Sequence, residues 1–216
     1  MVIVIVIVVV LIVLIGIYLV TTYNKLVKLR ERTRNAYAQI DVQLERRHDL
    51  IPNLVETVKG YLRHERETLE AVVAARAAAT QARIEVSGDP QNLEAMQRLS
   101  SSEGALGGAL ARLMAVAEAY PDLKANQNMA QLTEELTTTE NKIAFSRQNF
   151  NDQVNGYQTY KASFPPVVLA GPLGFGDAAY LDLDEAPQKR ENVQVSFDDA
   201  EPTDTIVPPR PGGTAD

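Results

Sequence analysis

The first twenty residues carry the strongest pattern in the chain. Val2 to Val20 is an apolar run interrupted only by Gly16 and Tyr18. At about 1.5 Å per residue, a helix of this length spans roughly 28 Å, the thickness of a hydrocarbon core. A signal peptide fits less well, because no basic residue precedes the run and Thr21-Thr22-Tyr23 does not resemble a cleavage site. A buried strand would rarely be this long. The run predicts a transmembrane anchor over residues 1–22.

Basic residues flank this run on its C-terminal side only. They are Lys25, Lys28, Arg30, Arg32 and Arg34. The positive-inside rule then places the N-terminus outside and the main domain in the cytoplasm. The same side chains are candidates for contact with anionic lipid headgroups, although the topology alone explains their position.

Beyond the anchor, apolar residues recur at the spacing of a helix. The stripe from Leu26 to Leu44 advances by threes and fours, and no helix breaker separates it from the anchor. We therefore predict one helix from the membrane to about Leu50, with roughly 48 residues and a length of about 70 Å. Pro52 either kinks a longer helix or starts a new one, and we favour a break.

Three further helical stripes follow. The second runs from Val55 to about Val86, the third from Leu93 to Ala117 and the fourth from Leu132 to Phe164. Turn signals separate them at Ser87–Pro90 and Tyr120–Asp122. Gly104, Gly107 and Gly108 predict a close approach of the third helix to another helix, within the bundle or between subunits. The pattern predicts an all-α fold, in which the transmembrane helix continues into an antiparallel four-helix up-and-down bundle over residues 23–164.

The C-terminal part has a different composition, rich in Pro, Gly and Asp from Pro165 onward. Leu173 to Leu183 is apolar enough to dock on the bundle, and Val193 to Phe197 alternates like a short strand, so residues 165–197 form a predicted docking extension. Residues 198–216 are a predicted disordered acidic tail. The net charge of −7 belongs to this end, because ten acidic and three basic residues follow from Asp177 onward.

The composition excludes several kinds of chemistry. The chain has no cysteine and only two histidines, so thiolate catalysis, disulfides and Cys-ligated metals are excluded. His64-Glu65 lacks the second histidine of a zinc protease helix, and the Glu-x-x-His pattern of di-iron bundles is absent. No basic surface favours nucleic acid as a partner. We predict no metal, no cofactor and no catalytic residue.

Charged residues fall on the apolar stripes, where side chains should be buried. They are Arg47 on the first stripe, Glu65 and Arg76 on the second, Glu103 on the third, and Glu140 and Arg147 on the fourth. Buried charges are tolerated only when they are paired. Arg76, Glu103, Glu140 and Arg147 fall at similar heights in an antiparallel bundle, which predicts a buried ionic cluster between the last three helices. We interpret it as a device that fixes helix register, with a proton-linked switch as the alternative.

Short runs along the chain also match a known family. They are Ile40–Leu44 followed by Arg46-Arg47, the unbroken Asp49–Tyr61, His64-Glu65, Arg76, Thr139–Ala144 with Arg147, and Phe150-Asn151. Over residues 20 to about 197 the chain resembles the bacterial LemA family. Tyr37 and Gln158 depart from it, since the family usually has tryptophan and often asparagine at these positions.

This resemblance implies a single-pass protein of the bacterial cell membrane, with an N-terminal anchor and a four-helix bundle. The family has no established catalytic activity. One branch takes part in forming magnetosome membranes, and other members are encoded near membrane peptidases. We therefore predict a non-enzymatic scaffold that self-associates or organises the membrane at its cytoplasmic face. Its expected partners are membrane lipid and further copies of itself. The alternative is an adaptor or regulator of a membrane peptidase or signalling system.

Overall fold

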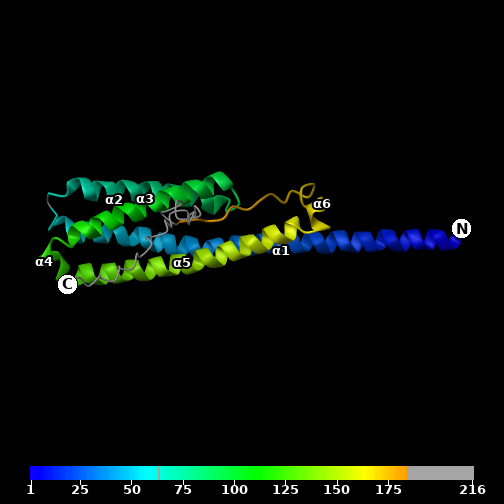
Figure 1. Cartoon of the computed structure of the whole chain (residues 1–216), viewed down its shortest axis with the longest axis horizontal. Helices are drawn as coiled ribbons and strands as arrows, with labels where there is room; N and C mark the ends of the chain where they lie inside the picture. Colours follow the sequence, from blue (N-terminus) through cyan, green and yellow to red (C-terminus); the bar gives the residue numbers. More distant parts are fainter. Residues whose placement is uncertain (63, 184–216) are drawn as a thin grey trace, which may run out of the picture. The chain divides into compact units, whose positions relative to one another are not determined.

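The computed structural model describes residues 1–62 and 64–183, and all regular secondary structure in these ranges is helical (Figure 1). The helices are α1 (Val2–Lys59), α2 (Arg66–Gly88), α3 (Leu93–Ala117), α4 (Pro121–Lys124), α5 (Gln127–Ala162) and α6 (Pro166–Ala170). The predicted all-α class and the long N-terminal apolar helix are confirmed. The predicted strand at 193–197 and the predicted tail at 198–216 lie outside the described residues.

Local sequence signals explain where the helices begin. Asn92 precedes α3, and its side-chain oxygen accepts a hydrogen bond from the backbone N–H of Ala95 at 3.0 Å. Asn126 precedes α5 and accepts from the N–H groups of Asn128 and Met129 at 2.9 and 3.2 Å. Both asparagines satisfy donors that have no partner inside the helix.

The long helices contact one another in three main pairs. α1 packs against α5 and against α2, and α2 packs against α3 (Figure 1). Their apolar faces form two separate buried clusters. The anchor-side core includes Leu26 to Leu44 of α1, and the distal core includes Ile51 to Val58 of the same helix. The two cores therefore share all four long helices but not a continuous apolar interior.

α1 does not break at Pro52, so the favoured prediction there is wrong. The helix continues to Lys59, and the first reversal of the chain follows it, between α1 and α2. Proline has no N–H to donate to the carbonyl oxygen of His48, one turn earlier. The Arg76 Nε of α2 donates to that oxygen instead, at 2.6 Å. A side chain from a neighbouring helix thus supplies the hydrogen bond that proline removes.

Two other predictions of the helical stripes need correction. α5 ends at Ala162, so Phe164 lies beyond the helix, and its exposed fraction is 82% rather than that of a core residue. A Cβ atom built on Gly104 or Gly108 meets no heavy atom within 4 Å. Among the described residues, these two glycines therefore make no close approach within the bundle, and close packing between subunits stays a prediction.

The segment that follows α6 lies along α5 without forming a strand. Asn151 bonds both backbone groups of Leu181, with its amide donating to the carbonyl and its oxygen accepting from the N–H, each at 3.0 Å. Gln158 donates to the carbonyl of Ala178 at 2.8 Å. Phe175, Ala178, Ala179 and Leu181 are buried in the anchor-side core. Side chains of α5 thus satisfy the backbone of this segment.

The pairing of Arg76 with Pro52 can be tested by a double-mutant cycle. Arg76→Met should lower the free energy of unfolding by about 1–3 kcal/mol, because it leaves the His48 carbonyl without a donor. In a Pro52→Ala background the same change should cost less, since the backbone N–H that alanine restores at this position can reach that carbonyl. Urea denaturation of the detergent-solubilised chain, followed by circular dichroism, measures both. An equal cost in the two backgrounds would contradict this account.

Candidate functional site

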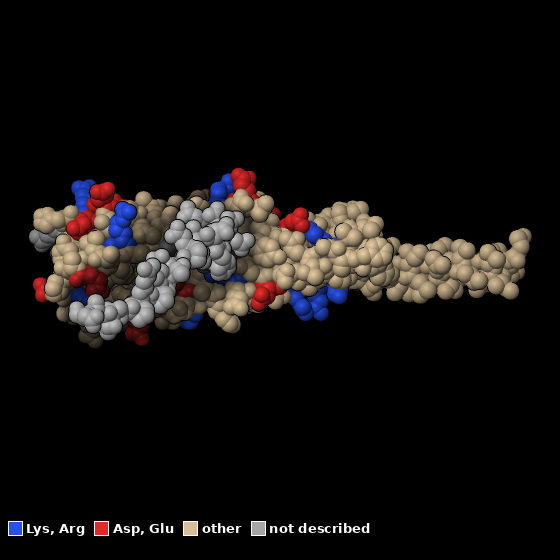
Figure 2. All heavy atoms as spheres, in the orientation of Figure 1, with Lys and Arg blue, Asp and Glu red and all other residues tan. Residues whose placement is uncertain are grey.

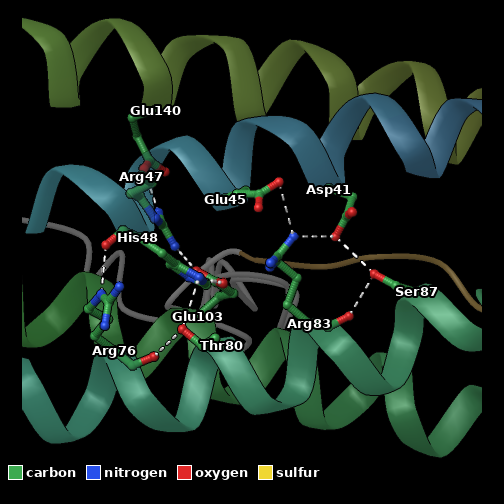
Figure 3. A network of polar contacts seen from close by, with 10 residues as sticks. All are labelled: Asp41, Glu45, Arg47, His48, Arg76, Thr80, Arg83, Ser87, Glu103 and Glu140. Carbon is green, nitrogen blue, oxygen red and sulfur yellow. Dashed lines mark hydrogen bonds and ion pairs between the residues drawn. The ribbon is translucent and has the colours of Figure 1, made fainter.

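A layer of polar side chains separates the two apolar cores (Figure 3). We call it the polar layer, and it consists of Arg47 and His48 of α1, Arg76 and Thr80 of α2, Glu103 of α3 and Glu140 of α5. On α1, α3 and α5 it falls between the core residues of the two clusters, as Thr80 does on α2, whereas Arg76 lies between Val72 and Ala79 of the distal core. On α1, for example, it lies between Leu44 and Ile51, and on α3 the layer residue lies between Leu99 and Leu106.

Arg47 and Glu103 form the buried centre of the layer. Their exposed fractions are 4% and 2%. The Arg47 Nη2 donates to Glu103 Oε2 in an ion pair, and its Nη1 donates to Glu140 Oε2 at 2.6 Å. One guanidinium therefore ties α1 to α3 and α5 together. Charge-assisted bonds of this kind are the stronger class of hydrogen bond.

His48 completes the centre from the next position of α1. It is 2% exposed, and its Nε2 lies 2.8 Å from Glu103 Oε1. Since a carboxylate only accepts hydrogen bonds, Nε2 carries a proton. Burial, and then the charges of Arg47, Arg83 and Arg76, lower the pKa of His48 to about 4. His48 is therefore neutral at pH 7.

The other ring nitrogen of His48, Nδ1, faces the hydroxyl of Thr80. Its Nδ1 lies 3.3 Å from Thr80 Oγ1, and the same hydroxyl lies 2.9 Å from the carbonyl oxygen of Arg76. With neutral His48, the hydroxyl hydrogen serves one of these acceptors at a time. With protonated His48, Nδ1 donates to Thr80 and the hydroxyl donates to the carbonyl. The Thr80 hydroxyl can therefore accept a hydrogen bond from protonated Nδ1 of His48, although burial of the ring opposes uptake of this proton.

A second group of polar contacts continues along the α1–α2 contact. Arg83, with a side chain only 14% exposed, lies 3.1 Å from Asp41 and 3.7 Å from Glu45. Ser87 donates to the same Asp41 oxygen at 3.0 Å. These contacts tie α2 to α1 on the anchor side of the polar layer (Figure 3).

The structure brings together part of the predicted ionic cluster. Glu103 and Glu140 each pair with Arg47, and Arg76 donates a hydrogen bond to the carbonyl oxygen of the next residue, His48. Arg147 does not join them. It is half-buried, and its Nη1 lies 3.9 Å from Asp182 Oδ1. Glu65 is half-buried at the start of α2, outside the layer. The predicted burial of Glu140 is wrong, since its side chain is 58% exposed.

The sequence reasoning missed His48 and gave α1 too small a part. The prediction joined the last three helices, whereas the layer centres on α1. A signal was present, because His48 lies four residues after Leu44 and three before Ile51, on the apolar stripe itself. Ending the first helix near Leu50 placed Arg47 and His48 in its last turn, whereas α1 continues for nine residues beyond Leu50.

The basic residues after the apolar run are mostly exposed. Lys28 and Arg32 point away from the core, and Arg34 lies 4.0 Å from Glu31. Two others rest on aromatic rings: the Lys25 Nζ lies 4.1 Å from the centre of the Tyr160 ring, and the Arg30 guanidinium lies 5.4 Å from that of Phe175. Such cation–π contacts hold the two side chains against the C-terminal part of the domain.

The described residues include no group of three or more His, Cys, Asp or Glu side chains that could hold a metal ion. The polar layer itself is filled by its own ion pairs. The layer therefore holds the helices together through ion pairs of balanced charge. Within it, His48 is the group that a change of pH could protonate.

Comparison with known proteins identifies sequence similarity to one family. The model of the LemA family matches residues 36–197. The chain is 26% identical over 181 residues to magnetosome protein MamQ 2 of Paramagnetospirillum magneticum, covering 76% of this chain and 65% of that protein. It is 26% identical over 178 residues to magnetosome protein MamQ of Magnetospirillum gryphiswaldense, with the same shares. The predicted resemblance is confirmed.

A further relative carries the name of the family. Protein LemA of Metamycoplasma hominis is 25% identical over 162 residues, covering 75% of this chain and 69% of that protein. The chain spans 65% of the length of the magnetosome proteins that it matches.

Removing the buried partner of Arg47 should cost far more than removing the exposed one. Glu103→Leu should destabilise the fold by about 3–5 kcal/mol, because it leaves a buried guanidinium with one partner fewer. Glu140→Ala should cost about 1 kcal/mol or less, since water reaches that carboxylate. Urea denaturation of the detergent-solubilised chain compares the two.

The double variant Arg47→Met/Glu103→Leu is the control for this comparison. It should be more stable than Glu103→Leu alone, because no buried charge remains at Arg47. His48 loses its acceptor in both variants, so the difference isolates the guanidinium. Similar costs for Glu103→Leu and Glu140→Ala would show that Glu103 is not the buried partner.

The lowered pKa of His48 predicts acid sensitivity with a defined sign. The folded pKa of about 4 lies below the ordinary 6.5, so the unfolded chain binds more protons between these values. Stability therefore falls as the pH is lowered through this window, by about 2 kcal/mol from pH 7 to pH 5. His48→Gln should remove this part of the pH dependence, whereas His64→Gln, at an exposed position, should retain it. Denaturation curves at several pH values measure it, and an unchanged slope in His48→Gln would refute it.

Proposed function

The chain belongs to the LemA family, and on this premise we propose that it is a non-enzymatic membrane-anchored scaffold, which self-associates or organises the membrane at its cytoplasmic face. The observation that carries the proposal is the continuity of α1. One helix of 58 residues, about 87 Å long, contains both the apolar run and core residues of the folded domain.

The division of α1 into two parts supports anchoring. Residues 2–21 are exposed, and the helix is long and apolar enough to cross a membrane. A bare apolar surface of this size is unfavourable in water and favourable in a bilayer. Burial begins at Thr22 and Leu26, directly after the run. The domain thus starts where the proposed membrane segment ends, and the basic residues that follow favour a cytoplasmic domain and an outside N-terminus.

The polar layer supports a role in which rigidity matters. It links α1 to α2, α3 and α5 through charged side chains whose partners are all part of the same domain. In our proposal these helices work as an antiparallel four-helix bundle, and the layer fixes their register. A change in the tilt of the membrane segment is then passed on to the whole domain, as a scaffold requires.

An apolar groove supports a second candidate function, that of an adaptor for a membrane protein such as a peptidase. The groove has a volume of about 750 Å³ and lies between the end of α1 and the start of α2. Val55, Leu62, Leu69 and Val73 line it, among others. The ion pairs Glu56–Lys59 and Arg66–Glu70 flank it at 3.2 and 2.6 Å.

Sizing of the intact protein distinguishes the two functions. After mild detergent extraction, a scaffold should run as a defined homo-oligomer, and mass spectrometry should find no second protein in fixed ratio. Insertion of two glycines between Val20 and Thr21 should reduce the assembly, because it breaks α1 just before the first buried residue. The same insertion between Gly88 and Asp89 leaves α1 intact and should have no effect. A monomeric wild type would contradict the self-associating scaffold, and a stoichiometric second protein would favour the adaptor.

A further inference from the structure

An uncharged segment lies against α1 at the point where the apolar run ends. We call it the α6 segment, and it comprises residues 162–176, which contain α6 and no charged side chain. It is tied to α1 by Phe175, whose ring meets the Tyr23 ring edge-to-face with centroids 5.6 Å apart. Ala170 and Phe175 share the anchor-side core with Leu26. This segment therefore sits at a fixed height on α1.

The other side of the α6 segment exposes large apolar side chains. Phe164 is 82% exposed, Val168 62%, Val167 50% and Leu173 41%. Pro166 and Ala170 of the same short helix are buried, so this helix has an inner and an outer face. A cluster of exposed apolar side chains on a folded domain marks an interaction surface.

The position of these exposed side chains along the axis of α1 indicates that they contact the lipid interface. Tyr23 lies three residues beyond Val20, or about 4.5 Å along the helix axis. The interfacial layer of a bilayer is about 5–7 Å thick on each side. If the apolar run spans the hydrocarbon core, the residues packed on Tyr23 fall within the interfacial layer. Figure 2 shows an uncharged surface where the domain meets the bare helix, with a group of basic side chains beside it.

We propose that the α6 segment is a second membrane contact, which inserts Phe164, Val167, Val168 and Leu173 into the lipid interface beside the anchor. The exposed Lys25 and Lys28 follow Tyr23 by two and five residues on α1, and their long side chains then reach the headgroups. This inference rests on the proposed membrane anchoring and deepens it. One helix alone leaves the domain free to rotate about the helix axis, whereas a second contact at its side fixes which face of the domain lies toward the membrane.

The absence of cysteine from the sequence makes the contact directly measurable. Single-cysteine variants Phe164→Cys and Val168→Cys of the full chain are labelled with a polarity-sensitive fluorophore and reconstituted into vesicles containing anionic lipid. The matched controls are Phe145→Cys and Ile84→Cys, whose parent residues are 75% and 56% exposed but lie on α5 and α2 away from the anchor. Leu11→Cys reports on the anchor itself.

Two quenchers separate lipid from water around each label. Labels at 164 and 168 should be quenched by a nitroxide on the upper acyl chain, and their quenching by aqueous iodide should be several-fold weaker than at 145 and 84. If 164 and 168 behave like these controls while 11 is quenched by lipid, the second contact is refuted and the anchor stands. If 11 is not quenched by lipid either, anchoring fails as well. Protection from iodide without quenching by lipid would assign the surface to a second copy of the chain and overturn the proposal.

Discussion

The pairing of Arg47 with Glu103 is the constraint on which the arrangement of the helices depends. Both side chains are buried, and neither charge is stable there alone. Sliding α1 by one turn relative to α3 would move the guanidinium by about 5.4 Å and leave both ions unpaired inside an apolar core. Apolar stripes tolerate such a slip, because one leucine resembles the next. The ion pair does not tolerate it, and it therefore selects one register among several that bury similar apolar area.

Pro52 strengthens this selection through the backbone. Its missing N–H frees the His48 carbonyl, and Arg76 of α2 donates to that oxygen. The position of α2 along α1 is thus fixed by a carbonyl that no other residue of α1 offers in the same way. Together with the pair on α3 and the contact to α5, one short stretch of α1 fixes three neighbouring helices. This explains how a domain without disulfides or metal ligands among its described residues can hold a defined register.

Patterns within one helix were readable from the sequence, and interactions between helices were readable only in part. The third stripe predicted Leu93 to Ala117, which are the observed bounds of α3, because capping and turn residues lie next to the helix they delimit. Pro52 was read as a break because its compensating donor lies 24 residues away on another helix. The same error ended the predicted helix two residues after His48, which in the structure lies well inside α1. Glu103 could be identified as a buried charge, whereas the exposure of Glu140 depends on how α5 is rotated, which periodicity alone does not determine.

A continuous helix gives the domain a fixed tilt but not a fixed rotation. α1 passes from the apolar run into the core without interruption, so bending at the junction is opposed by its backbone hydrogen bonds. Rotation about the axis of α1 meets no such resistance from the anchor. Resistance must come from a part of the domain that lies to one side of the axis and at the level of the lipid interface. Among the described residues, the α6 segment combines that height with a row of exposed apolar side chains. The proposed scaffold, if it presents one face to neighbouring copies, needs both constraints, and the core that buries Phe175 against α1 couples the second to the first.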